Sequence, residues 1–180
     1  DWKGYSDDNI SLELYPQEYP AYGHTDLRFP AYEVKNSDGN CISCLKYKGY
    51  AIKEGIVNIQ GMPGLFVGDK NAQTLEITAF DDVTGLEVIL FYTIFDEYDI
   101  ILRSTKFINK SENEITINSA YSANLDIDKG EYDVIYFSGA WARERGMCRD
   151  EITSGIKIDL SNARGGSGHC INPFVMVADT

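Results

Sequence analysis

The chain has 180 residues, of which 43% are hydrophobic and 24% are charged, and this composition excludes a disordered protein. Acidic residues outnumber basic ones, 28 to 16, and the formal net charge of -12 argues against a surface for nucleic acid or for an anionic membrane. No apolar run reaches the length of a transmembrane helix. No basic segment followed by an apolar one marks a signal peptide, so we expect a cytoplasmic protein.

The sequence predicts strands that follow one another at intervals of about ten residues, with turn residues between them. Residues 10–14 alternate between apolar and polar, as a half-buried strand does. Residues 31–34 are expected to pair, through a turn at 36–40, with a returning hairpin strand over 44–52. One helical turn is expected over Met147–Ile152. Further strands are expected over 74–80, 86–94, 100–108, 115–127, 132–137, 155–160 and 173–177.

This pattern predicts an all-β fold, an antiparallel sandwich or barrel with little helix. Carboxylates are abundant, but no pair is nominated for glycoside hydrolysis. Asp126 and Asp128, for example, border a turn, where aspartate is an ordinary residue.

Cys41 and Cys44 form a CxxC motif, which is used in zinc sites and in redox proteins. A zinc site needs a second such pair or nearby histidines, and a redox motif opens a helix, whereas here a strand is expected. The remaining candidate ligands are scattered through the chain: Cys148, Cys170, His24 and His169. We therefore expect reduced thiols, with no metal and no cofactor.

The segment 138–145 combines a tryptophan with charged residues after a small-residue break. The ring of Trp141 suits the C–H face of a sugar, while Arg143, Glu144 and Arg145 suit its hydroxyl groups. The alternative is a core tryptophan beside a solvated charge cluster. Farther on, the Gly-rich run 164–174 lacks the spacing of a phosphate-binding loop, and its Arg164 and His169 are expected either to bind a ligand or to cap the loop.

Three segments, in this order, resemble the N-terminal part of the glycoside hydrolase family 36 α-galactosidases. They are residues 18–32, the GAWARER motif at 139–145 and the Gly-rich run 164–174. Shorter matches at 74–77, 85–88 and 103–104 keep the family's order and spacing. The third motif departs from the family pattern at Gly166, Gly168 and Cys170, and His24 stands where relatives commonly carry asparagine.

The resemblance implies an N-terminal β-sandwich, of the supersandwich type found in galactose mutarotase, that precedes a catalytic (β/α)8 barrel and a C-terminal β domain. Family members remove terminal α-linked galactose from melibiose and raffinose-type sugars with retention of configuration, and they use two aspartates of the barrel. The tryptophan of the GAWxRER motif reaches from the sandwich to the galactose pocket, and this role falls on Trp141. Its candidate supporting residues are Arg143, Glu144, Arg145 and His169.

We expect residues 1–180 to form a single β-sandwich domain, a fragment of a larger N-terminal domain without the barrel, whose usual size is about 250 residues. The chain itself is therefore expected to hold no catalytic residue and to be inactive alone. The resemblance also implies a homo-oligomer, because family members often form tetramers. Two alternatives stay open: a stand-alone carbohydrate-binding module or lectin, and a purely structural or oligomerising domain with Trp141 in its core.

Overall fold

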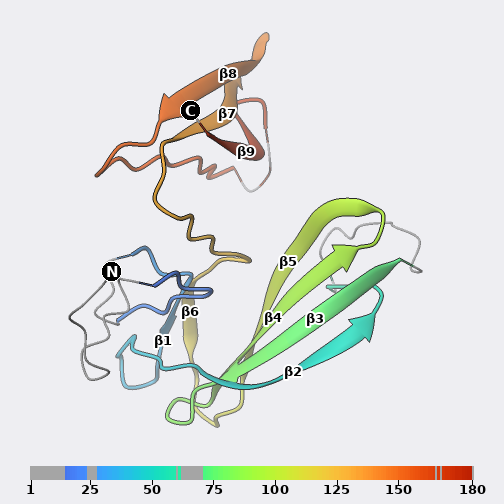
Figure 1. Cartoon of the computed structure of the whole chain (residues 1–180). Coiled ribbons are helices and arrows are strands. Elements are labelled where there is room, and N and C mark those ends of the chain that lie inside the picture. The colour runs from blue at the N-terminus through green and yellow to red at the C-terminus, as the bar shows by residue number, and fades with distance from the viewer. Residues whose placement is uncertain are drawn as a thin grey trace, which may run out of the picture. The chain divides into compact units, whose positions relative to one another are not determined.

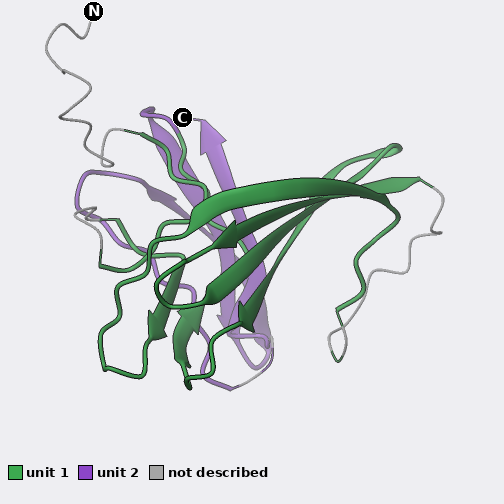
Figure 2. Ribbon diagram, turned by 90° about the horizontal axis from the view of Figure 1, so that it is seen from below, with its two compact units in different colours: residues 1–127 green, residues 128–180 purple. Residues whose placement is uncertain are grey.

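The computed structural model describes residues 15–23, 28–59, 61, 71–164, 166 and 168–179. The chain divides into two compact units, residues 1–127 and residues 128–180 (Figure 2). The strands pair antiparallel within three sheets, which confirms the predicted all-β fold. The described residues form no helix, and hence none that could cross a membrane.

The first unit consists of a large sheet and a small one (Figure 1). The large sheet has the order β2-β3-β4-β5, and the small sheet pairs β1 with β6. The strand bounds are β1 Tyr32–Lys35, β2 Lys46–Glu54, β3 Ala72–Phe80, β4 Leu86–Phe95, β5 Tyr98–Asn109 and β6 Thr116–Ala120.

The hydrophobic core of the first unit lies between these two sheets. Alternate residues of a strand face the same side, so Leu86, Val88 and Leu90 of β4 all turn toward β1. There they pack against Tyr32 and Val34, which are almost completely buried. The small sheet therefore covers part of one face of the large sheet.

The predicted hairpin between residues 31–34 and 44–52 is wrong. Strand β1 pairs instead with β6, with Tyr32 opposite Ala120, and β2 pairs with β3. The turn at 36–40 does form, because the side chains of Asn36, Asp38 and Asn40 hydrogen-bond within it. After this turn the chain enters a different sheet. Strand β1 pairs with β6 because this pairing buries its apolar face against the large sheet.

Asp81 ties the β3–β4 turn to the segment before β2. Its side chain is only 2% exposed and accepts hydrogen bonds from the backbone N–H groups of Cys44, Val83 and Thr84, at 2.8 to 3.2 Å. Burial by itself raises the pKa of this carboxyl, but the backbone hydrogen bonds outweigh burial and lower the pKa below its ordinary value. Ionised Asp81 therefore stabilises the fold.

We expect Asp81→Ala to lower the free energy of unfolding by about 2 kcal/mol, because three backbone N–H groups lose the buried carboxylate that accepts from them. Asp82→Ala is the matched control, since Asp82 is half exposed and pairs with lysines, and it should cost at most about 1 kcal/mol. The folded pKa of Asp81 is lowered, so its contribution is full above the unfolded pKa and disappears as the pH falls through the folded pKa. Urea unfolding at pH 7 and below pH ~4 measures the free energy of unfolding of each variant. Equal losses in Asp81→Ala and Asp82→Ala at pH 7 would contradict the stabilising role of Asp81.

The second unit is a three-stranded sheet in the order β8-β7-β9. Its strands are β7 Tyr132–Ala140, β8 Arg143–Glu151 and β9 Ile171–Asp179. The helical turn expected over Met147–Ile152 is wrong, because residues 147–151 belong to β8 and pair with β7. The strand expected over 155–160 is also absent, since these residues join no sheet in the described structure.

The other expected strands within the described residues are present with shifted bounds. The run 115–127 forms a strand only as β6, and the strand expected over residues 10–14 lies outside the described residues.

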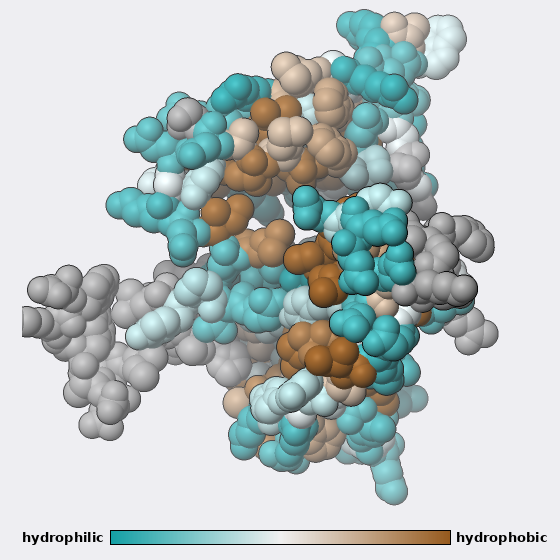
Figure 3. Space-filling view, turned by 45° about the vertical axis from the view of Figure 1, so that its right-hand side comes forward, coloured by the Kyte–Doolittle hydropathy of each residue, from teal (hydrophilic) through white to brown (hydrophobic). Residues whose placement is uncertain are grey.

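Apolar side chains gather on the second unit, in the upper part of Figure 3. In β8 and β9 the exposed apolar residues are Met147, Phe174, Val175, Met176 and Val177.

Candidate functional site

Trp141 lies at the tip of the hairpin that joins β7 to β8. Ala140 pairs with Arg143, so Trp141 and Ala142 form a two-residue turn between the strands. The side chain of Trp141 is 83% exposed, a high value for the largest apolar side chain. The interpretation of Trp141 as a core residue is therefore wrong, and the indole is open to a ligand or to another surface.

The backbone of this hairpin departs from regular geometry at two positions. Ala142 has a φ of 62° and Arg145 a φ of 59°, in the left-handed region that residues with a side chain rarely adopt. Arg145 lies in a bulge, where Glu144 and Arg145 together stand opposite Gly139 of β7. Unusual backbone of this kind is often found where a side chain must be aimed.

Glu144 reaches back over the turn. Its Oε1 atom accepts a hydrogen bond from the N–H of Ala142 at 2.8 Å. The N–H groups of Glu144 itself and of Ala142 lower the pKa of this carboxyl, and the nearby charge of His169 lowers it further. Glu144 therefore stays ionised and continues to accept the turn hydrogen bond at neutral pH.

Gly139 is the point where the hairpin meets the Gly-rich run. Its N–H donates to the carbonyl oxygen of Cys170 at 3.0 Å. A Cβ atom at this position would overlap the carbonyl oxygen of Arg143 and would lie 2.9 Å from the Cα of Glu144 and 3.0 Å from the carbonyl oxygen of His169. All three obstacles belong to backbone, so only glycine allows the two segments to approach each other here.

The remaining predicted site residues lie around this junction. Arg143, Arg145 and His169 are exposed. Within the described structure, the side chains of Arg143 and Arg145 make no hydrogen bond or ion pair. In the Gly-rich run, the Asn162 side chain closes the loop by accepting from the N–H of Arg164 and donating to the carbonyl of Gly166, both at 2.8 Å.

Sequence reasoning did not single out Gly139 and Ala142 within the motif. A glycine two residues after the predicted strand 132–137 was the signal for the first. Nothing in the sequence marked Ala142, because alanine carries no preference for a left-handed turn.

The contacts of the CxxC motif favour a structural role for its two cysteines. All four cysteines are free, and the N–H of Cys44 is one of the donors to Asp81. Desolvation and the adjacent Glu33 raise the pKa of the Cys41 thiol, which disfavours the reactive thiolate. Among the residues that the structure describes, no group of three or more histidine, cysteine or acidic side chains is arranged to hold a metal ion.

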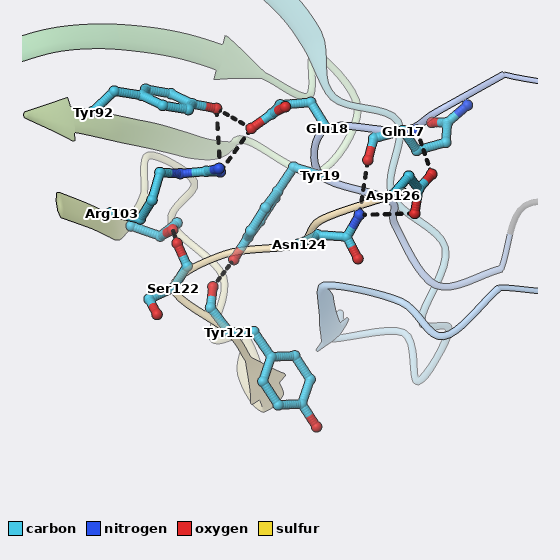
Figure 4. A network of polar contacts seen from close by, with 10 residues as sticks. Gln17, Glu18, Tyr19, Tyr92, Arg103, Tyr121, Ser122, Asn124 and Asp126 are labelled. Carbon is cyan, nitrogen blue, oxygen red and sulfur yellow. Dashed lines mark hydrogen bonds and ion pairs between the residues drawn. The ribbon is translucent and has the colours of Figure 1, made fainter. Parts of the chain in front are cut away.

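In the first unit, a polar network holds the beginning of the segment 18–32 (Figure 4). Glu18 accepts from the hydroxyl of Tyr92 at 2.5 Å and forms an ion pair with Arg103 at 2.7 Å. The guanidinium of Arg103 lies over the ring of Tyr92, 4.2 Å from its centroid. Burial, followed by the hydrogen bond to Glu18, raises the pKa of Tyr92, so this hydroxyl remains a donor.

The same network fixes this segment to the chain that follows β6. The hydroxyl of Tyr19 donates to the carbonyl of Tyr121 at 2.6 Å, and the side chain of Asn124 donates to the carbonyl of Gln17 at 2.8 Å (Figure 4). Asp126 accepts from the N–H of Gln17 and forms an ion pair with Arg28. Both ends of the segment are therefore anchored, whereas His24 lies outside the described residues.

Known proteins resemble this chain along nearly its whole length. The family model for the glycosyl hydrolase family 36 N-terminal domain matches residues 2–180. α-Galactosidase AgaA of Geobacillus stearothermophilus is 40% identical over 171 residues, which are 94% of this chain and 23% of the relative. The bifunctional α-galactosidase/sucrose kinase AgaSK of Mediterraneibacter gnavus is 39% identical over 96% of this chain and 18% of the relative.

Solved structures agree with these relatives. The crystal structure of an AgaA variant from Geobacillus stearothermophilus in complex with stachyose has a TM-score of 0.91 and 37% identity, over 98% of this chain and 25% of that structure. The galactosidase domain of AgaSK has a TM-score of 0.89 and 40% identity, over 94% of this chain and 23% of that structure.

The structure is thus that of an all-β, antiparallel protein that exposes a tryptophan at the tip of a hairpin. The chain belongs to the glycosyl hydrolase family 36 N-terminal domain family, and its sandwich type agrees with that family. It spans about a quarter of the length of the α-galactosidase AgaA that it matches.

Proposed function

We propose that this chain is the non-catalytic N-terminal sandwich domain of a retaining α-galactosidase that acts on terminal α-D-galactosides such as melibiose and raffinose-type sugars. In this proposal the catalytic aspartates reside in a (β/α)8 barrel outside residues 1–180. Family membership supports the proposal, as does the substrate class of the AgaA variant solved with stachyose.

The observation that carries the proposal for the site is the 83% exposure of Trp141 at the end of a backbone-anchored hairpin. A flat apolar ring that contacts little of its own unit is suited to cover the C–H face of a galactose ring. Arg143 and Arg145 flank it with guanidinium groups that can donate to hydroxyl groups or to the surface of the catalytic domain. We therefore assign Trp141 as one wall of a galactose pocket whose chemistry occurs in another domain.

Two further parts of the proposal concern the whole protein. We propose that it forms a homo-oligomer, a tetramer as in the family, which sedimentation of the whole protein would test. The cytoplasmic location expected from the sequence stays a prediction, to be tested by cell fractionation.

The test compares the 180-residue chain with the whole protein that carries it. We expect the whole protein to release galactose from raffinose and from a chromogenic α-galactoside, while the chain alone releases none. In calorimetry with galactose and melibiose, the chain alone should show no binding, because one wall of a pocket lacks most of its contacts. Hydrolysis by the chain alone would overturn the proposal, and binding of free sugar by the chain would favour the lectin alternative.

A further inference from the structure

The turn that carries Trp141 has a conformation that its own residues do not favour. Ala142 occupies the left-handed region with a φ of 62°, where the Cβ atom of an alanine lies too close to the following carbonyl oxygen. A glycine or an asparagine is the usual residue at such a position in a two-residue hairpin turn. An interaction outside the turn residues must therefore help to hold this conformation.

That interaction is the hydrogen bond from the N–H of Ala142 to Oε1 of Glu144, 2.8 Å long. Hydrogen bonds to a charged acceptor are stronger than those between neutral groups, and this one acts directly on the residue in the left-handed conformation. The carboxylate thereby closes a small ring that fixes the residue following Trp141.

The two neighbouring arginines do not share this task. Arg143 and Arg145 are exposed, and within the described residues their side chains contact no hydrogen-bond or ion-pair partner. The side-chain charge that acts on the Glu144 carboxylate is that of His169 from the Gly-rich run. Among the described residues, Glu144 is therefore the side chain that hydrogen-bonds the turn backbone, in addition to the strand pairing of Ala140 with Arg143.

We propose that Glu144 is a positioning residue, which aims the indole of Trp141 by holding Ala142 in the left-handed conformation, whereas Arg143 and Arg145 leave the turn geometry unchanged. The inference rests on the proposed function only where it concerns activity. It concerns the shape of the hairpin first, and this shape is measurable without a substrate.

The first measurement uses the chain with Trp2→Phe, in which Trp141 is the one remaining tryptophan of the two. Glu144→Ala should lower the steady-state fluorescence anisotropy of Trp141. The fast component of the anisotropy decay should increase, because the turn loses its hydrogen bond and the indole moves more freely. Glu144→Gln keeps an oxygen acceptor and should stay close to the parent protein. Arg143→Ala is the matched control, and it should also stay close to the parent.

The second measurement needs no substitution and so does not depend on whether a variant folds. In a ¹H–¹⁵N spectrum, the amide of Ala142 should move as the pH is lowered through the titration of the Glu144 carboxyl, and the amide of Gly155, in a loop of the same unit, should not follow. An Ala142 amide that ignores this titration would overturn the proposal. Unchanged Trp141 anisotropy in a folded Glu144→Ala variant would do the same.

Activity of the whole enzyme separates this proposal from the proposed function. Glu144→Ala should lower kcat/KM about tenfold, mainly through KM, because a misaimed contact group costs binding. Combined with Trp141→Ala it should add almost nothing, since both substitutions remove the same contact. Full additivity would overturn the positioning role. If Trp141→Ala leaves activity intact, the proposed function fails, while the anisotropy and amide results still decide the role of Glu144.

Discussion

Replacing Trp141 by alanine in the whole enzyme is expected to lower kcat/KM for raffinose about 30-fold. A central aromatic contact contributes about 2 kcal/mol to recognition, and each 1.4 kcal/mol corresponds to about a tenfold change. The free energy of unfolding should change by less than about 1 kcal/mol, because a side chain that is 83% exposed leaves no cavity behind. Steady-state kinetics and urea unfolding of the same preparation measure both effects.

The matched variant is Trp141→Phe, which keeps a flat apolar ring on the same backbone and should restore most of the activity. A structural role makes the opposite prediction, since truncation of a buried tryptophan costs about 3–5 kcal/mol of stability. Loss of stability together with loss of activity would therefore favour the structural alternative. Unchanged activity in a stable Trp141→Ala variant would show that Trp141 does not line the galactose pocket.

Gly139→Ala is expected to destabilise the second unit by about 3 kcal/mol, or to prevent the hairpin from closing on the Gly-rich run. The added methyl would overlap the carbonyl of Arg143 and approach the backbone of Glu144 and His169 to within 3.0 Å. Backbone atoms cannot turn away as a flexible side chain does, so either β8 or the loop must move. The hydrogen bond from Gly139 to Cys170 would lengthen as a result.

Gly166→Ala is the matched control within the same run. A Cβ at Gly166 meets nothing within 4 Å, and this glycine has no positive φ. The substitution Gly166→Ala should therefore change the free energy of unfolding by no more than about 0.5 kcal/mol. Thermal unfolding and the amide spectra of residues 138–146 compare the two variants, and equal effects would show that the close approach at Gly139 is not what requires glycine.

Local patterns were sufficient to predict much of the large sheet. Residues 74–80 alternate in polarity and residues 86–94 contain an apolar run of strand length, and the structure has β3 and β4 there, joined by a turn over 81–85. The reason is that alternation places one set of side chains in a core while Asp81 satisfies the N–H groups of the turn. These signals lie within a few residues of one another.

The failures concern partners that are distant in sequence. Strand β1 pairs with β6 rather than with the segment that follows its turn, because Tyr32 and Val34 are buried against β4. Residues 155–160 alternate like a strand but find no neighbour among the described residues. Residues 147–151 extend as β8 because β7 supplies a ladder for them. Pairing depends on what the rest of the chain offers, which a local pattern does not contain.

The candidate site likewise has features that can be predicted from the sequence and features that depend on the fold. Residue types and their order were enough to predict the all-β class, the family and Trp141 with its charged neighbours as a candidate site. The exposure of Trp141, the hydrogen bond from Ala142 to Glu144 rather than to another side chain, and the contact of Gly139 with the Gly-rich run became visible only in the folded chain. Exposure, a left-handed φ and the approach of backbone segments far apart in sequence arise from packing, and packing exists only once the strands have found their partners.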